Sequence, residues 1–163
     1  MMDILHKNQD SIVQAAALLI RTARVVLKYA DRHFYLTLHI SLAKHMVLQS
    51  LFLNKGTMTL SDLATFTSTE RHNITTLVNR LKKDGLVTAR RDRQDRRFVN
   101  ITITDEGSSV LTKAWPVARQ ISETLMLSMT EDDLNKSLKS LTTIYQNALQ
   151  ALGEAITSTE SSG

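Results

Sequence analysis

Apolar residues recur at helical spacing through most of the chain. From Asp10 to Ala30 they follow i, i+3, i+4 and i+7, which predicts a long helix. The segment 31–40 is rich in aromatic rings and lacks this spacing, so we expect a break there. A second helix is expected to begin at the N-cap Ser41 and to stop at Gly56. We expect this helix to bury Ala43, Met46, Val47, Leu51 and Phe52.

A brief helix, begun by Thr59 or Ser61, precedes the most strongly patterned helix of the chain. Thr67 with Glu70 three residues later fits a capping box for this strongly patterned helix, and Gly85 marks its end. Its apolar stripe consists of Ile74, Leu77, Val78 and Leu81. Its polar side chains, of the types that hydrogen-bond base edges, are His72, Asn73, Thr75, Thr76 and Asn79. Two helices in this order predict a helix-turn-helix.

Two short strands with alternating apolar residues follow, at Leu86–Arg90 and Phe98–Ile103. The segment 91–97 between them is too charged to be buried, and arginine side chains suit phosphate and the minor groove. Asp92 and Asp95 could hold two of these arginines by ion pairing. A helix-turn-helix followed by an arginine-tipped hairpin predicts a winged helix-turn-helix domain, so the fold class is mainly α with a small β wing.

The helices outside this domain carry more apolar surface than one chain can cover. After the wing, Thr104 caps a helix in which a kink is expected at Pro116, and Thr130 caps a last helix that runs to about Ile156. We expect these arms to pair with those of a second chain. The domains are therefore an N-terminal dimerisation helix over 1–35, the DNA-binding domain over 36–107, and C-terminal dimerisation helices over 108–163.

Positive charge is concentrated in the predicted DNA-binding domain. Residues 69–97 hold nine Lys or Arg and four Asp or Glu, whereas the rest of the chain holds eleven and twelve. We expect the polar residues of the helix to read bases in the major groove, mainly from its N-terminal half. The residues expected to bind phosphates are Arg71, Arg80, Lys82 and Lys83. Those expected in the minor groove are Arg93, Arg96 and Arg97.

Several function classes lack support in the sequence. There is no cysteine, no Ser–His–acid spacing and no glycine-rich phosphate loop, so we expect neither an enzyme nor a bound cofactor. His33, His39 and His45 are six residues apart, which puts no two on one helical turn, and we expect no metal site. The start is no signal peptide, and the longest apolar run, Ala15–Ile20, is too short to span a bilayer. A cytoplasmic location is expected.

Residues 92–107 resemble the wing signature of the MarR family of transcriptional regulators. Asp95-Arg96-Arg97 matches its Asp-x-Arg, Ile103-Thr104 stands where the family usually has Leu-Thr, and Gly107 closes the pattern. The segment 79–87 also resembles the end of the family's recognition helix. The resemblance implies a homodimer formed through the terminal helices. We expect such a dimer to bind double-stranded DNA at an inverted-repeat operator, as a repressor that a ligand releases.

The resemblance also implies roles for particular residues. Arg97 would be the arginine that reaches the minor groove and Asp95 its orienting partner; the alternative for Arg97 is an ion pair without DNA contact. Family members commonly bind small aromatic or phenolic effectors between the arms and the DNA-binding domain. Here that region should include Tyr29, His33, Tyr35, His39, Met46 and Trp115. The alternative for these residues is ordinary core packing, and the alternative for the chain is a winged-helix module that binds protein or RNA.

Overall fold

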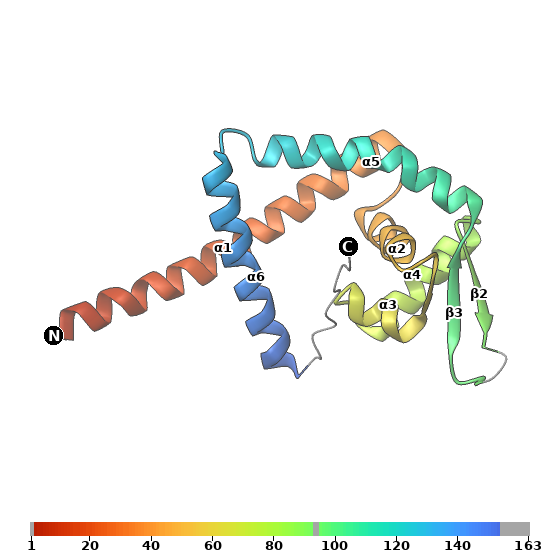
Figure 1. The fold of residues 1–163 in the computed structure, drawn as a ribbon, viewed down its shortest axis with the longest axis horizontal. Helices are drawn as coiled ribbons and strands as arrows, with labels where there is room; N and C mark the ends of the chain where they lie inside the picture. The colour runs from red at the N-terminus through yellow and green to blue at the C-terminus, as the bar shows by residue number, and fades with distance from the viewer. Residues whose placement is uncertain (1, 93–94, 154–163) are drawn as a thin grey trace. The chain divides into compact units, whose positions relative to one another are not determined.

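The computed structural model describes residues 2–92 and 95–153. The chain forms two compact units, Met1–Ser122 and Glu123–Gly163. Six helices and three strands lie in the described part of the chain, which confirms the mainly α fold with a small sheet. In order they are α1 (Met2–Leu38), α2 (Leu42–Leu53), β1 (Thr57–Thr59), α3 (Leu60–Phe66), α4 (Arg71–Lys83), β2 (Val87–Arg91), β3 (Val99–Ile103), α5 (Asp105–Leu125) and α6 (Glu131–Leu152) (Figure 1).

The sheet is antiparallel, with strand order β1-β3-β2, so that β3 lies in the middle. Ile101 of β3 pairs with Met58 on one side and Ala89 on the other, and its side chain is fully buried. Val87 and Leu86 add buried side chains where β2 leaves α4. The helices α2, α3 and α4 contribute the remainder of this core, mainly Val47, Leu48, Leu51, Leu63, Ile74, Val78 and Leu81.

The break predicted over residues 31–40 is wrong, because α1 continues to Leu38. No proline or glycine interrupts this segment, and rings one helical turn apart contact each other. The ring centroids of Tyr29 and His33 are 5.6 Å apart and tilted, and those of Tyr35 and His39 are 6.0 Å apart and edge-to-face. The helix ends at His39, which has a positive φ of 55°. A ring-rich composition therefore does not indicate a loop here, because i, i+4 ring contacts support a helix.

The capping box predicted at Thr67 and Glu70 is also wrong. Thr67 follows α3, and its hydroxyl donates to the Leu63 carbonyl over 2.7 Å. The helix α4 begins at Arg71, and its N-cap, Glu70, makes no side-chain capping bond. The turn between α3 and α4 uses the hydroxyl that the sequence pattern assigned to the next helix.

Three other helix starts are confirmed. The hydroxyls of Ser41 and Thr59 accept backbone N–H groups at the starts of α2 and α3, and Thr130 forms a capping box with Asp133 at α6. Asp31 of α1 accepts the Leu42 N–H over 2.8 Å, which ties the start of α2 to α1. The helix α5 runs through Pro116 as one helix, as expected. The helix α6 ends at Leu152, before Gly153 with its φ of 71°, and so stops short of the predicted end at Ile156, which lies outside the described residues.

The burial predicted for α2 is only partly right. Val47 and Leu51 are buried, but Ala43 is exposed, Met46 is 39% exposed and Phe52 is 62% exposed. The helix instead turns His45, Leu48 and Ser50 inward together with Val47 and Leu51. Because α2 is apolar on more than one side, periodicity alone did not identify the side that faces the core.

Helix α1 leaves its apolar residues uncovered over much of its length. Val13, Ile20 and Leu27 are seven residues apart, so they share one face, and they are 67%, 57% and 53% exposed. Helix α6, taken by itself, also carries exposed apolar side chains, namely Leu138, Leu141, Ile144, Tyr145 and Leu152. Exposed apolar faces of this extent mark surfaces for another partner.

Candidate nucleic-acid interface

The orientation of α4 is set by its buried face. Ile74, Val78 and Leu81 are between 0% and 3% exposed and pack in the core with α2, α3 and the sheet. The turn before α4 is fixed by Ser68, with a φ of 47°, and by the Thr69 N–H, which donates to the Ala64 carbonyl over 2.9 Å. The opposite face of α4 therefore points to solvent.

The residues predicted to read bases lie on the solvent side of α4. His72, Asn73, Thr76 and Asn79 are exposed and Thr75 is half-buried. The Thr75 hydroxyl donates to the Arg71 carbonyl over 2.7 Å, and the Thr76 hydroxyl donates to the His72 carbonyl over 3.2 Å. Both hydroxyls then offer only lone pairs outward, whereas an Asn amide offers a donor and an acceptor side by side. That pair of groups is what an adenine edge can bind in bidentate fashion.

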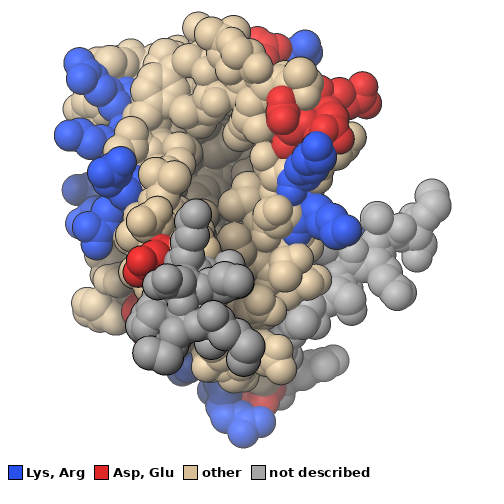
Figure 2. Space-filling model, turned by 90° about the vertical axis from the view of Figure 1, so that its left-hand side faces the viewer, with Lys and Arg blue, Asp and Glu red and all other residues tan. Residues whose placement is uncertain are grey.

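Cationic side chains lie at both ends of α4. Arg71 begins the helix, and Arg80, Lys82 and Lys83 occupy its last turn, where the helix dipole favours positive charge. All four side chains are exposed. Figure 2 is drawn from the side opposite the wing; Lys and Arg side chains gather along one edge of that face, and the view does not assign them to α4. Lys44 of α2 is engaged differently, because its ammonium lies 2.5 Å from the carboxylate of Asp84, just after α4.

The wing tip is built around Asp92. Its carboxylate accepts the Asn100 amide over 2.9 Å and the Asp95 N–H over 3.0 Å. The Asp92 N–H donates to the Phe98 carbonyl, and the Phe98 N–H donates to the Asp95 carbonyl, each over 3.0 Å. These bonds hold residues 95–98 in a defined turn. Asp92 thus shapes the tip through backbone groups and an amide, a role that the sequence reading did not assign to it.

Asp95 holds Arg97 in a fork. The Arg97 Nε lies 3.0 Å from both Asp95 carboxylate oxygens, and Nη2 lies 2.6 Å from one of them. This pairing lowers the pKa of Asp95 and raises the pKa of Arg97, because each charge is stabilised by the other. The Arg97 side chain nevertheless remains 85% exposed. The geometry fixes the direction of the guanidinium, while the role of the pair toward DNA stays a prediction.

Other arginines add charge to the wing. Arg96 is exposed next to Arg97, and Arg93 lies outside the described residues. Arg90 and Arg91 are exposed on β2, opposite Asn100 and Val99 of β3. Arg90 was not among the residues predicted for the interface. The adjacent arginines Arg90 and Arg91 were the signal in the sequence, because a strand end with this much positive charge stays exposed.

The joint between the wing, α4 and α5 explains the Thr-x-x-Gly of the sequence pattern. The Thr104 hydroxyl donates to the Gly85 carbonyl over 2.8 Å and accepts the Gly107 N–H over 3.0 Å. A Cβ atom at Gly107 would lie 2.2 Å from the Leu86 carbonyl oxygen, closer than any real contact. Only glycine fits this position. Thr104 and Gly107 therefore fix where α5 starts relative to the end of α4.

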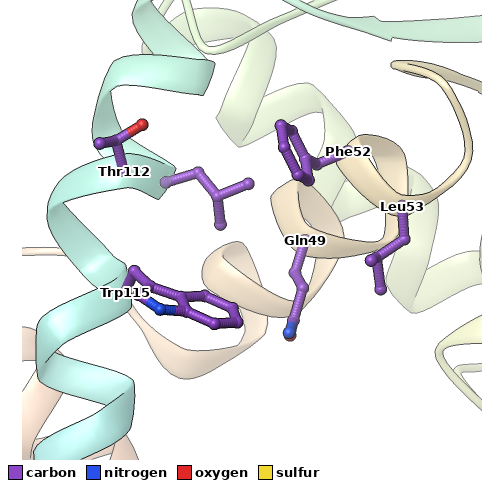
Figure 3. Close-up of a pocket in the computed structure, with 6 residues that line it drawn as sticks. Gln49, Phe52, Leu53, Thr112 and Trp115 are labelled. Atoms are coloured by element: carbon purple, nitrogen blue, oxygen red, sulfur yellow. The ribbon is translucent and has the colours of Figure 1, made fainter.

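A hollow of about 400 Å³ lies between α2 and α5, lined by Gln49, Phe52, Leu53, Leu111, Thr112 and Trp115. Figure 3 shows the Trp115 indole projecting from α5 toward α2, with Gln49 across from it and Phe52 farther along α2. A smaller hollow of about 180 Å³ is lined by Met46, Gln49, Ser50, Leu53, Phe66 and Thr67. Gln49 and Leu53 therefore border both hollows.

The six residues predicted for an effector pocket are divided by the structure. Trp115 lines the larger hollow and Met46 the smaller one. Tyr29 contacts His33, and Tyr35 contacts His39, along α1, and none of these four lines either hollow. Phe52 was predicted as core and was missed as a lining residue. Phe52 and Leu53 are the last two residues of α2, so their apolar side chains lie on different faces of the helix.

Some site types find no support in the described residues. In residues 2–92 and 95–153 no group of three or more His, Cys, Asp or Glu side chains is placed to hold a metal ion. Over the same residues, no helix has the length and apolar character needed to cross a membrane.

The helices α3 and α4 pack in the core through their buried faces, and an arginine-bearing hairpin follows them. This arrangement defines a winged helix-turn-helix protein. Within this class, residues 40–97 match the MarR family. The MarR resemblance seen in the sequence is thereby confirmed, and the relatives found are transcriptional regulators.

Individual relatives show the same likeness. The chain is 25% identical over 92 residues to the HTH-type transcriptional repressor IacR of Pseudomonas putida, a match that spans 56% of this chain and 55% of that protein. The structure of the transcriptional regulator BldR from Sulfolobus solfataricus superposes with a TM-score of 0.76 at 25% identity, over 85% of this chain and 96% of that one. The organohalide-sensing regulator RdhR-CbdbA1625, in its 2,4-dichlorophenol-bound form, gives a TM-score of 0.74 at 20% identity, over 83% and 80%.

Proposed function

We propose that this protein is a sequence-specific DNA-binding transcriptional regulator that acts in the cytoplasm as a homodimer. The observation that carries the proposal is the solvent-facing side of α4, where His72, Asn73 and Asn79 are exposed between cationic helix ends. Exposed amide and imidazole groups beside Lys and Arg side chains are the chemistry of base reading combined with phosphate binding.

Three groups of residues divide the work of recognition in this proposal. His72, Asn73, Thr75, Thr76 and Asn79 read bases in the major groove. Arg71, Arg80, Lys82 and Lys83 bind phosphates, and so add affinity that salt weakens. The wing enters the minor groove through Arg97, with Arg93 and Arg96 beside it. Asp95 orients Arg97, because its carboxylate holds Nε and Nη2 of that guanidinium in a fixed fork.

Dimerisation accounts for the apolar surface of the terminal helices. Val13, Ile20 and Leu27 are exposed along one face of α1, and α6 carries its own exposed apolar side chains. A two-fold dimer built on these helices presents two copies of α4 to successive major grooves, about 34–36 Å apart. The operator is then an inverted repeat.

Regulation by a small ligand completes the proposal. A relative in the family is named a repressor, and a structural neighbour is described with 2,4-dichlorophenol bound. In this chain the hollow between α2 and α5 has the volume of a small-ligand site. A small aromatic or phenolic ligand that changes the distance between the two copies of α4 would release the repressor from DNA, because both half-sites could no longer be bound at once.

Selection of bound duplexes from a random pool tests the proposal. We expect the full-length protein to enrich an inverted repeat whose half-site centres are one helical turn apart. Competition with scrambled duplex then measures the preference. Equal binding of selected and scrambled DNA, or binding to RNA alone, would favour the alternative of a winged-helix protein- or RNA-interaction module.

A further inference from the structure

Two charged side chains lie at helix ends that disfavour them. Lys44 is in the first turn of α2, where its N–H donates to the Ser41 hydroxyl over 3.3 Å. Asp84 is the C-cap of α4. The helix dipole favours anions at the start of a helix and cations at its end, so each charge lies at the end that its own helix disfavours. A local preference for helix therefore explains neither residue.

The two charges pair with each other. The Lys44 ammonium contacts the carboxylate of Asp84, forty residues further along the chain, although Lys82 and Lys83 precede Asp84 on its own helix. The Lys44 side chain is only 21% exposed and that of Asp84 is 40% exposed. Ion pairs near the surface contribute little to the free energy of unfolding, so stability alone gives this pair little value. Its effect is to be sought in what it holds in place.

The end of α4 is bonded to two other parts of the domain at adjacent residues. Asp84 joins it to the first turn of α2, and the Gly85 carbonyl accepts the hydroxyl of Thr104, just before α5, over 2.8 Å. At the other end of α4, the N-cap Glu70 makes no side-chain capping bond. The buried side chains of α4 decide which face is turned inward, whereas the polar contacts at Asp84 and Gly85 decide where the last turn lies.

A small tilt at this end displaces the other end of α4. Asn73 lies ten residues before Lys83, which is about 15 Å along the helix axis. A tilt of about 5° about the last turn therefore moves Asn73 by roughly 1.3 Å. Bidentate hydrogen bonds to a base edge tolerate less than this, because N–H···O distances span only about 2.7–3.2 Å.

The first turn of α2 is also bonded to α1. The Asp31 carboxylate accepts the N–H of Leu42, two residues before Lys44, over 2.8 Å. A carboxylate at the start of α2 is favoured by the helix dipole. The first turn of α2 thus contacts α1 through Asp31 and the end of α4 through Asp84. It is the point at which the helix with the uncovered apolar face is joined to the end of α4.

We infer that Lys44 is a positioning residue for DNA recognition. Through Asp84 it holds the end of α4 at the first turn of α2, and so aims the N-terminal half of α4 at the bases. The inference rests on the proposed function, in which α4 reads the major groove. Its two parts are measured separately, first without DNA and then with it.

Amide hydrogen exchange measures the holding contact without DNA. Lys44→Met keeps the length of the side chain and removes its charge. We expect the amides that close the end of α4, those of Asp84, Gly85 and Leu86, to exchange at least about threefold faster, while those of α3 keep their rates. Lys136→Met breaks an ion pair within α6 and is the matched control. Unchanged rates at the end of α4, or an equal acceleration throughout the domain, overturns the inference.

Asp84→Ala separates position from charge, because the two have opposite effects on DNA binding. Loss of an acid beside Lys82 and Lys83 should by itself tighten binding to any duplex. Loss of the contact with Lys44 should lower the preference for operator over scrambled duplex, by about three- to tenfold in a gel shift. Glu70→Ala removes an acid at the other end of α4 and is the control. It should leave that preference unchanged.

Exchange of the two charges completes the test. Lys44→Asp combined with Asp84→Lys keeps the net charge and places each charge at the end that its helix favours. We expect this double variant to regain most of the preference lost in Asp84→Ala, and to protect the end of α4 as the unaltered protein does. A preference that Asp84→Ala leaves unchanged, or that the exchanged pair does not regain, overturns the inference.

Failure of the proposed function gives a different result. The unaltered protein would then show no preference between duplexes. The exchange rates of Lys44→Met would still decide whether Lys44 holds the end of α4.

Discussion

The winged-helix core and the first half of α1 are built from the same kind of apolar pattern, yet only one of them is covered. Ile74, Val78 and Leu81 of α4 are almost completely buried, whereas Val13 and Ile20 of α1 are more than half exposed. The period of the apolar residues is helical in both. The difference shows that helical periodicity specifies a face that needs a partner and does not say whether that partner is in the same chain.

The largest effect is expected at the joint that orients the covered region. Gly107→Ala places a Cβ 2.2 Å from the Leu86 carbonyl oxygen and 2.9 Å from a side-chain carbon of Ile103. We expect the free energy of unfolding to fall by about 3 kcal/mol or more, measured by chemical denaturation. The control is Gly85→Ala, where a Cβ meets nothing within 4 Å and only the φ of 75° is strained. It should cost about 1–2 kcal/mol, and equal losses in the two variants would remove the joint from the explanation.

The uncovered region is tested by charging its exposed face. We expect the double substitution Val13→Asp and Ile20→Asp to leave the helix content and the winged-helix core intact while converting the dimer to monomers. Operator affinity should then fall roughly a hundredfold, because the second half-site no longer binds intramolecularly. Sedimentation and gel shift measure the two effects. Gln14→Asp, at an exposed polar position of α1, is the matched control. A double variant that remains dimeric would contradict a role of this face in dimerisation.

The same comparison shows what could be read from the sequence. The β2 and β3 strands, the positions of α3 and α4 and the Thr-x-x-Gly pattern could be read from the sequence, because alternation, helical spacing and turn residues are local signals. The uninterrupted α1 was missed, since contacts such as Tyr29 with His33 depend on a helix already being present. The hollow between α2 and α5 could not be predicted, because Phe52 and Trp115 come to line it only through packing of α2 against α5.

Within the winged-helix region, the wing and α4 should fail in different ways. Arg97→Ala removes the guanidinium held by Asp95 and should weaken operator binding by at least about tenfold while the dimer and its helix content persist. Lys136→Ala removes an exposed cation of α6 and serves as the control. Titration in a gel shift measures the change. If Arg97→Ala binds the operator as tightly as the unaltered protein, the arginine only pairs with Asp95.

Substitutions on α4 should change preference more than affinity. Asn73→Ala and Thr76→Ala each remove an exposed polar group from the face turned to solvent. We expect the preference for operator over scrambled DNA to drop by about 1–3 kcal/mol for a residue that reads a base directly. Affinity for scrambled DNA should change little, because phosphate contacts dominate it. Equal losses on both duplexes would mean that these residues only position the helix.

The smallest effect concerns His45 of α2, whose ring packs on Phe34 of α1. His45 is 4% exposed, its ring stacks on Phe34 at 4.4 Å, and its Nδ1 finds no hydrogen-bond partner among the described residues. Burial lowers the pKa of His45, so the unfolded chain binds a proton more readily than the folded one as the pH falls. Stability is therefore fully present above about pH 6.5 and decreases as the pH drops through that value toward the lower pKa of the folded state.

This pH dependence can be assigned to one ring. His45→Phe keeps an aromatic ring against Phe34 and cannot take up a proton, so its unfolding free energy should fall less between neutral and mildly acidic pH than that of the unaltered protein. His39→Asn is the control, since asparagine tolerates the positive φ at the end of α1 and His45 still titrates. Denaturant melts across this range measure both variants. If His45→Phe loses as much stability in acid as the unaltered protein, the sensitivity of the covered region to pH arises elsewhere.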